Sequence, residues 1–207
     1  GAMQWMAGDV SATTGIKGAG DFLSKTIRGK VTGESVIKPE YTGDGTLVLE
    51  PTYKHIILLD LDEWGNSIVL DDGLFLACES TLKQKAVRRK TFSSAFAGGE
   101  GFFNLGLKGS GVVCIESDCS REELVEITLE DDVVKIDGNL AIAWSGSLDF
   151  TVERAGKSLL GSAASGEGLV NVYRGTGKVL LAPVGNQAMK PQQVIEKEPV
   201  IVGDDDE

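Results

Sequence analysis

Short runs in which apolar and polar residues alternate follow one another along most of the chain. A two-residue period places every second side chain on one face, which is the pattern of a half-buried β-strand. Helical periodicity is rare, and the one capping signature, "SREEL" from Ser120, has no periodic apolar run behind it. The sequence therefore predicts an all-β protein. The predicted strands are residues 47–49, 55–61, 67–70, 74–78, 102–107, 112–115, 124–129, 133–136, 140–144, 150–153, 169–173 and 179–181.

Two pairs of these runs are joined by an Asp-Gly dipeptide. "SIVLDDGLFLAC" contains Asp72-Gly73, and "VVKIDGNLAIAW" contains Asp137-Gly138. Asp-Gly suits the tight turn of a hairpin, in which both central residues have positive φ. The pattern predicts two β-hairpins.

The phrases "GDGTLVL", "GSGVVCI" and "GTGKVLL" begin at Gly43, Gly109 and Gly175, so each starts 66 residues after the one before it. A Gly-Glu pair precedes each phrase by nine or ten residues. Such a fixed interval indicates three internal repeats of about 66 residues. We expect them to pack about a pseudo-threefold axis as a barrel-like, double-stranded β-helix fold. The repeated residues are Gly33, Glu34, Gly43, Gly45, Gly99, Glu100, Gly109, Gly111, Gly166, Glu167, Gly175 and Gly177.

The repeated Gly-x-Gly also resembles part of a phosphate-binding loop. Such a loop follows a strand and opens a helix, whose amides and dipole hold the anion. Here a strand follows the glycines, so we interpret them as bulges or corners. The repeated glutamates Glu34, Glu100 and Glu167 would bind a cation if they formed a ring. We favour a structural role, in which each accepts backbone hydrogen bonds.

Composition sets the protein's class and surroundings. With 207 residues and few prolines, we expect one β domain over residues 1–184 and an extended acidic tail over residues 185–207. The net charge of −11 argues against binding to nucleic acid or to an anionic membrane surface. Three cysteines, Cys78, Cys114 and Cys119, indicate reduced thiols in a cytoplasmic protein. The longest apolar run, "HIILLDL", is too short to span a bilayer, so we expect no transmembrane segment.

The sequence offers little catalytic or metal-binding chemistry. The interval between Cys114 and Cys119 is not that of a zinc-ligand pair, and His55 is the chain's single histidine. Nucleophilic catalysis needs a base beside the nucleophile, and no such motif is present. We therefore expect no catalytic residue, no metal and no cofactor.

One basic stretch stands out in this acidic protein. "KQKAVRRK" brings together Lys83, Lys85, Arg88, Arg89 and Lys90. These residues would form a patch for an anion, a nucleic acid or an acidic partner. The alternative, which we favour, is a charged edge strand that resists sheet-to-sheet aggregation or pairs with acidic residues of a neighbouring subunit.

Several phrases in order resemble the bacterial relatives of the protein called altered inheritance of mitochondria twenty-four. They are "WMAGDV", "TGES", "DGLFLA", "GGEGFFNLGLKGSGVV" and "GEGLVNVYRGTGKVLLAP". The resemblance implies a β-rich fold similar to that of the trp RNA-binding attenuation protein, and no established enzymatic activity. The mitochondrial member is linked to inner-membrane organisation, a role that does not carry over directly.

We therefore expect a non-enzymatic assembly, scaffold or binding protein that forms homo-oligomers. The alternative is a nucleic-acid or anion binder that uses residues 83–90. A third possibility is a small-ligand pocket inside a barrel.

Overall fold

The computed structural model describes residues 3–13, 39–50, 52–88, 90–91, 103–138, 140–154 and 169–183. In these residues the secondary structure is β-strand apart from one 3-10 helix, which confirms the predicted all-β class. The elements are β1 (Met3–Thr13), β2 (Glu40–Leu49), β3 (His55–Asp60), η1 (Leu61–Trp64), β4 (Ser67–Leu70), β5 (Phe75–Cys78), β6 (Lys83–Arg88), β7 (Lys90–Thr91), β8 (Phe103–Lys108), β9 (Val112–Ser117), β10 (Val125–Asp137), β11 (Ala141–Ser145), β12 (Asp149–Arg154) and β13 (Leu169–Leu181). The predicted tail 185–207 lies outside the described residues.

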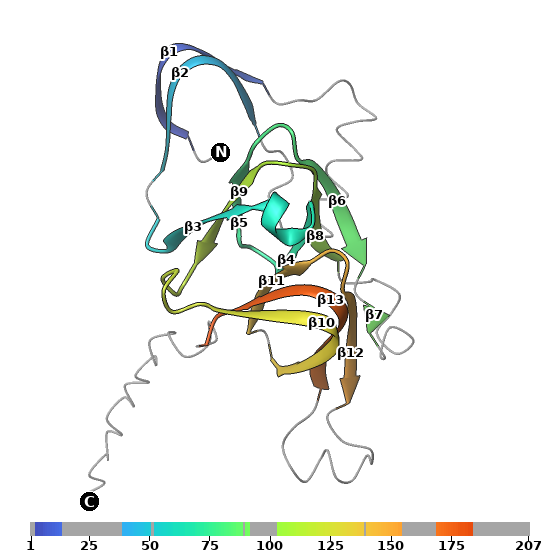
Figure 1. Ribbon diagram of the computed structural model, residues 1–207. Coiled ribbons are helices and arrows are strands. Elements are labelled where there is room, and N and C mark those ends of the chain that lie inside the picture. Colours follow the sequence, from blue (N-terminus) through green and yellow to red (C-terminus); the bar gives the residue numbers. More distant parts are fainter. Residues whose placement is uncertain are drawn as a thin grey trace, which may run out of the picture.

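The strands form three sheets, which are almost entirely antiparallel (Figure 1). The largest has eight strands in the order β6-β8-β4-β11-β13-β12-β7, with β10 on the other edge of β13. A second sheet has the order β3-β9-β5, and β1 pairs with β2 alone. Figure 1 shows the β1–β2 pair at one end of the molecule, away from β12 and β13.

The long strand β13 organises the largest sheet because it is paired along both edges. β10 pairs with one edge of β13. On the other edge, β12 pairs with residues 169–174 and β11 with residues 179–181. Asn171 Nδ2 donates to the Gly138 carbonyl oxygen at 2.8 Å, and the Ala182 amide donates to the Leu140 oxygen at 2.8 Å. The two ends of β13 therefore meet the same short connection between β10 and β11, which requires the strand to curve.

Gly109 and Gly111 form a corner between β8, which belongs to the largest sheet, and β9, which belongs to the three-stranded sheet. Both glycines have positive φ, 137° and 140°. The Leu61 amide donates to the Gly111 oxygen at 3.0 Å, and the Gly109 amide donates to the Asn66 oxygen at 3.0 Å. Leu61, the first residue of η1, and Asn66, which follows η1, are thus hydrogen-bonded to the corner.

The two predicted hairpins are wrong. β4 pairs with β8 and β11, whereas β5 pairs with β9, so Asp72-Gly73 connects two different sheets. Asp137-Gly138 leads from one edge of β13 to the other. Of the turn residues, only Gly73 and Gly138 have positive φ. In both places Asp-Gly therefore connects two strands that do not pair with each other. Between β10 and β11 lies β13, which comes later in the chain.

Several strand boundaries also differ from the prediction. Residues 125–129 and 133–136 belong to one strand, β10, whose register shifts between Leu129 and Asp132. Residues 169–173 and 179–181 are the two ends of β13. β1, β6, β7 and the first half of β2 were not predicted, because glycine and charged residues interrupt their apolar pattern.

The core is divided into two clusters. The larger lies under β3, β9 and η1, and includes Leu61, Ile68 and Leu107, each completely buried. The smaller contains an aromatic group, Trp144, Phe150 and Tyr173, whose ring centroids lie 5.0–5.3 Å apart. Aromatic pairs at this separation add to the stabilisation from buried area.

The corner predicts a large cost for Gly109→Ala. An added Cβ would lie 2.8 Å from the Thr81 carbonyl oxygen, at a φ that side chains rarely adopt. At Gly73, with φ 75°, an added Cβ would meet no atom within 4 Å. We expect Gly73→Ala to lower the free energy of unfolding by about 1 kcal/mol and Gly109→Ala by about 3 kcal/mol. Urea unfolding would measure both, and equal losses would contradict the close-packed corner.

Candidate functional site

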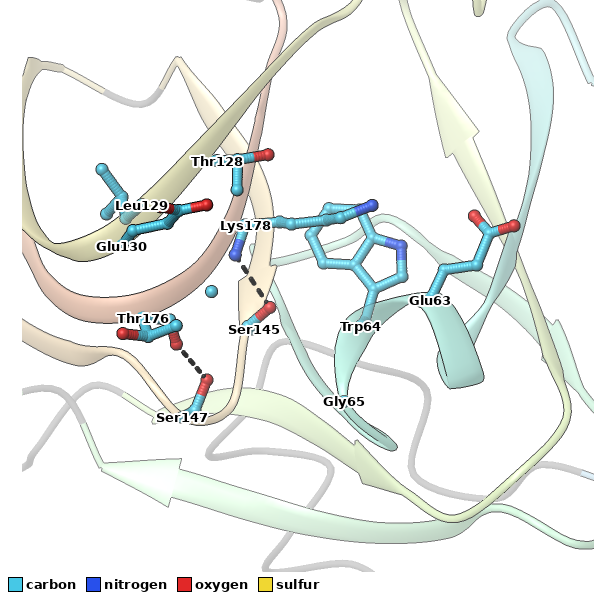
Figure 2. A pocket seen from close by; sticks show the side chains of 11 residues that line it. Glu63, Trp64, Gly65, Thr128, Leu129, Glu130, Ser145, Ser147, Thr176 and Lys178 are labelled. Atoms are coloured by element: carbon cyan, nitrogen blue, oxygen red, sulfur yellow. Dashed lines mark hydrogen bonds between the residues drawn. The ribbon is translucent and has the colours of Figure 1, made fainter.

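A cleft of about 320 Å³ opens between η1, the middle of β10, the turn after β11 and the middle of β13 (Figure 2). Its walls carry hydroxyl and charged side chains around one tryptophan. The lining residues are Glu63, Trp64, Gly65, Thr128, Leu129, Glu130, Ser145, Ser147, Thr176, Gly177 and Lys178.

Hydrogen bonds between these elements hold the cleft together. The Lys178 amide donates to Ser145 Oγ at 3.0 Å, and Ser147 Oγ donates to the Thr176 oxygen at 2.8 Å (Figure 2). Asp131, at the register shift of β10, has a φ of 53° and donates its amide to Thr176 Oγ1 at 3.0 Å. The Gly-x-Gly stretch of β13 therefore forms one wall of a cleft and is not followed by a helix.

Lys178 is the one cationic residue of the lining, and it already has partners. Its Nζ lies 2.9 Å from Glu126 Oε1 and 5.8 Å from the centre of the Trp64 ring. An ammonium over an indole face is stabilised by the ring quadrupole. Ser145, Ser147 and Thr176 already take part in hydrogen bonds between the elements of the cleft, and Lys178 is paired with Glu126. Two carboxylates, Glu63 and Glu130, also line the cleft.

His55 and Ser117 are a second candidate, because they are direct partners in the β3–β9 register. Ser117 is buried, and its Oγ accepts a hydrogen bond from the Cys119 amide at 3.1 Å. Among the described residues no hydrogen bond joins His55 to Ser117, and His55 is exposed. The imidazole is therefore not arranged to take the hydroxyl proton, which nucleophilic catalysis requires.

Cys78, Cys114 and Cys119 form no disulfide in the described part of the chain. Burial, aided by the nearby Glu116 carboxylate, raises the pKa of Cys114, which disfavours the thiolate. Within the described ranges, no three His, Cys, Asp or Glu side chains are grouped so that they could hold a metal ion.

The basic stretch lies largely on an edge strand. β6 pairs only with β8 in the described part of the chain, and Lys83 and Lys85 are exposed. Lys83 lies directly opposite Lys108, and Lys85 lies opposite Gly106. Arg88 belongs to β6 and Lys90 to β7, but their side chains and the whole of Arg89 lie outside the described residues.

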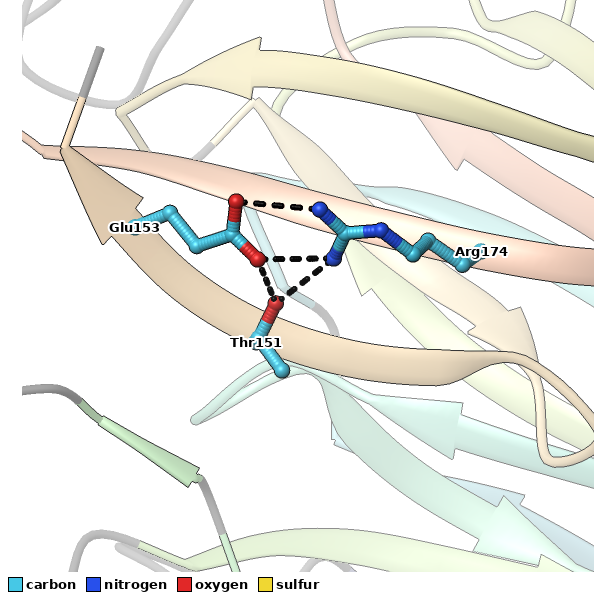
Figure 3. Close-up of polar contacts among 3 residues, drawn as sticks. All are labelled: Thr151, Glu153 and Arg174. Atoms are coloured by element: carbon cyan, nitrogen blue, oxygen red, sulfur yellow. Dashed lines mark hydrogen bonds and ion pairs between the residues drawn. The ribbon is translucent and has the colours of Figure 1, made fainter. Parts of the chain in front are cut away.

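β12 and β13 carry an ion pair. Arg174 Nη1 lies 2.7 Å from Glu153 Oε1, and Nη2 donates to Oε2 at 3.0 Å (Figure 3). Thr151 Oγ1 donates to Glu153 and accepts from Arg174. The Arg174 and Thr151 hydrogen bonds lower the pKa of Glu153 from 4.5 to about 2. Arg174 is therefore held by a carboxylate, whereas Lys83 and Lys108 lie opposite each other.

The predicted repeat residues divide into two groups. Gly43, Gly45, Gly109, Gly111, Gly175 and Gly177 lie in or beside strands, and all but Gly45 have positive φ. Gly33, Glu34, Gly99, Glu100, Gly166 and Glu167 lie outside the described residues. Sequence reasoning missed Trp64, Ser147 and Lys178, whose grouping arises only when η1, β11 and β13 come together.

Known proteins similar to this chain give its family and fold. Residues 1–184 match the family described as mitochondrial biogenesis AIM24. An uncharacterized protein of Streptococcus pyogenes serotype M6 is 31% identical over 188 residues, covering 87% of this chain and 73% of that protein. A Streptococcus pyogenes crystal structure from a structural genomics consortium aligns with a TM-score of 0.63 and 29% identity, over 91% of this chain and 82% of that chain. No helix in the described part of this chain is long and apolar enough to cross a membrane.

The Glu153–Arg174 pair predicts a pH dependence. Because the folded-state pKa of Glu153 is lowered to about 2, the pair stabilises the fold above pH 4.5, and this contribution is lost as the pH falls from 4.5 towards 2. An NMR titration of the Glu153 carboxyl group should give a midpoint near 2. In Arg174→Gln the midpoint should return towards 4.5, and in Thr151→Val it should rise less. An unchanged midpoint in Arg174→Gln would contradict the assigned cause.

Proposed function

The chain belongs to the mitochondrial biogenesis AIM24 family, and from that premise we propose that it is a non-enzymatic assembly protein that forms homo-oligomers. We propose further that its domain consists of three repeats of about 66 residues arranged in the manner of a double-stranded β-helix. The support for each part comes from a different feature of the described residues.

Strand register supports the repeats. Ser67 pairs with Lys108 and Val133 with Arg174, and each partner is 66 residues from its counterpart. The same interval relates Phe75–Ile115 to Ala141–Leu181, and Lys83–Lys108 to Asp149–Arg174. A register shift follows Phe75, Ala141 and Met3 alike, opposite residues 115, 181 and 49.

The proposal of self-assembly rests on the exposed apolar face of β3. Ile57 and Leu59 are 3% exposed, while Ile56 and Leu58, which point the other way, are 48% and 66% exposed. Leu58 lies opposite Cys114 of β9, which in turn lies opposite Ala77 of β5. Contact with a second copy would remove this apolar face from water, which is the usual reason for a strand that is apolar on both faces.

The non-enzymatic character is supported by the state of the polar groups. Ser117 Oγ is engaged by a backbone amide, His55 is exposed, and Lys178 is paired with Glu126. None of these groups is prepared to transfer a proton or to attack an electrophile.

Native mass spectrometry of the full chain should detect an oligomer. The double variant Ile56→Lys/Leu58→Lys should weaken association by about a hundredfold, because two charges would have to be desolvated in the contact. Val125→Lys is the matched control, since Val125 on β10 is also 48% exposed. A monomeric wild-type protein, or equal weakening by the control, would contradict the proposed face.

A second function, anion binding, is favoured by the opposed lysines. Like charges directly across a strand pair repel each other unless a counter-charge is present. In the described part of the chain Lys83, Lys85 and Lys108 have no carboxylate partner, in contrast to Arg174 with Glu153. A bound polyanion would supply the missing charge.

A labelled single-stranded DNA oligonucleotide tests this second function. If the lysines bind phosphates, Lys83→Glu/Lys108→Glu should abolish a salt-dependent anisotropy change, while Lys135→Glu on β10 should have little effect. The slope of log affinity against log salt should fall by about 1–2 when the two charges are lost. Binding that is absent, or equally sensitive to Lys135→Glu, would count against the patch.

A further inference from the structure

β3 lies at the edge of the three-stranded sheet, whose order is β3-β9-β5. Hydrogen bonds next to the β3–β9 pair show which residues of β3 face its open edge. In an antiparallel pair, hydrogen-bonded and non-hydrogen-bonded positions alternate. The Leu61 amide donates to the Gly111 oxygen at 3.0 Å, one position beyond the last pair of β3 with β9. Ile57 and Leu59, two and four residues earlier, are therefore hydrogen-bonded to β9 through both backbone groups.

The other edge of β9 gives the same alternation independently. The Glu116 amide donates to the Leu74 oxygen at 2.8 Å, so the backbone groups of Glu116 point towards β5 and away from β3. Glu116 is the register partner of Ile56. The amide and carbonyl groups of Ile56 and Leu58 consequently point away from β9, to the side on which β3 has no strand in the described part of the chain.

This edge carries an apolar sequence. Residues 56–59 are all isoleucine or leucine, and they pair with β9 without a register shift. Edge strands that stay unpaired usually carry lysine, proline or a bulge, since a free edge is a template for another strand. β6, at the edge of the largest sheet, has such lysines, Lys83 and Lys85. β3 therefore has the character of a strand that is paired along both edges.

Opposite charges bound this apolar stretch. Lys54 comes two residues before Ile56, and its Nζ lies 3.9 Å from Asp118 Oδ1, with 37% of the side chain exposed. Asp60 comes two residues after Leu58, is exposed, and accepts a hydrogen bond from the Asp62 amide at 3.0 Å. The order along the strand is thus positive, apolar, apolar, negative, which is complementary to itself when the strand is reversed.

We propose that β3 pairs antiparallel with β3 of a second copy, across a twofold axis at Ile57, so that two three-stranded sheets become one sheet of six strands. The proposal rests on the self-assembly proposed above and specifies its geometry. Such a contact is isologous, because each copy presents the same edge to the other.

The charges select this register among those that place edge-facing residues opposite each other. With the axis at Ile57, Ile56 lies opposite Leu58 of the second copy, and Lys54 lies opposite Asp60 of the second copy. Apolar pairs and opposite charges directly across a strand pair are both stabilising. Sliding the strands by two residues would place Lys54 opposite Leu58, or Asp60 opposite Ile56.

One contact then satisfies two needs of β3. The backbone groups of Ile56 and Leu58 gain hydrogen-bond partners in the second copy. Their side chains, 48% and 66% exposed in one chain, gain apolar neighbours on the outward surface of the joined sheet.

Hydrogen-deuterium exchange of the full chain at single-residue resolution tests the edge contact. The amides of Ile56 and Leu58 should exchange at least about tenfold more slowly in the oligomer than after dilution to the monomer. Ile57 and Leu59 are internal controls on the same strand, since their amides bond to β9. Their exchange should change much less.

The possible results separate this geometry from self-assembly itself. An oligomer in which Ile56 and Leu58 exchange as fast as in the monomer would overturn edge pairing and leave a face-to-face contact. A protein that is monomeric at all concentrations would overturn both proposals. Slow exchange of these two amides that persists in the monomer would mean that another segment of the same chain covers the edge, which would also overturn a second copy.

A charge exchange tests the register. Lys54→Glu and Asp60→Lys should each weaken association by about tenfold, because each places like charges opposite each other at both ends of the contact. The double variant Lys54→Glu/Asp60→Lys should associate nearly as the wild type does. Loss of the Asp62 hydrogen bond or of the Asp118 ion pair would persist in the double variant, so a merely structural effect gives no recovery. Absence of recovery would overturn the register.

Discussion

Pairing of one curved strand along both of its edges is the constraint on which the rest of this structure depends. β13 must curve so that Asn171 and Ala182, near its two ends, both reach the connection between β10 and β11. Gly175 and Gly177, with φ of 115° and 157°, lie where β10 shifts its register. Backbone geometry at these glycines thus decides where three other strands lie. The Gly109–Gly111 corner has the same effect on β3, β4, β5 and β6.

The surface chemistry follows from that geometry. The cleft forms where β10 bulges away from β13, and η1 brings Trp64 against Lys178. β12 and β13 place Glu153 and Thr151 around Arg174, whereas β6 and β8 place Lys83 against Lys108. The surface therefore carries a closed ion pair in one place and two opposed lysines in another.

Alternation along the chain was sufficient to predict the class and most of the strands, because burial of one face imposes a two-residue period. It failed for β1 and β6, where Gly8, Asp9 and the lysines interrupt the period on largely exposed strands. The hairpin prediction failed for a different reason. Asp-Gly reports a local turn, but the strand that separates β10 from β11 is β13, more than twenty residues later. The cleft could not be predicted, since Trp64 and Lys178 are separated by 113 intervening residues.

The position of β13 at the end of the described chain has a consequence for synthesis. β10, β11 and β12 leave the ribosome before the strand that pairs with all three. Their edges must stay apart from one another and from other chains until residues 169–181 have emerged, so the largest sheet closes only when translation of the domain is nearly complete. Long-range pairing of this kind folds slowly.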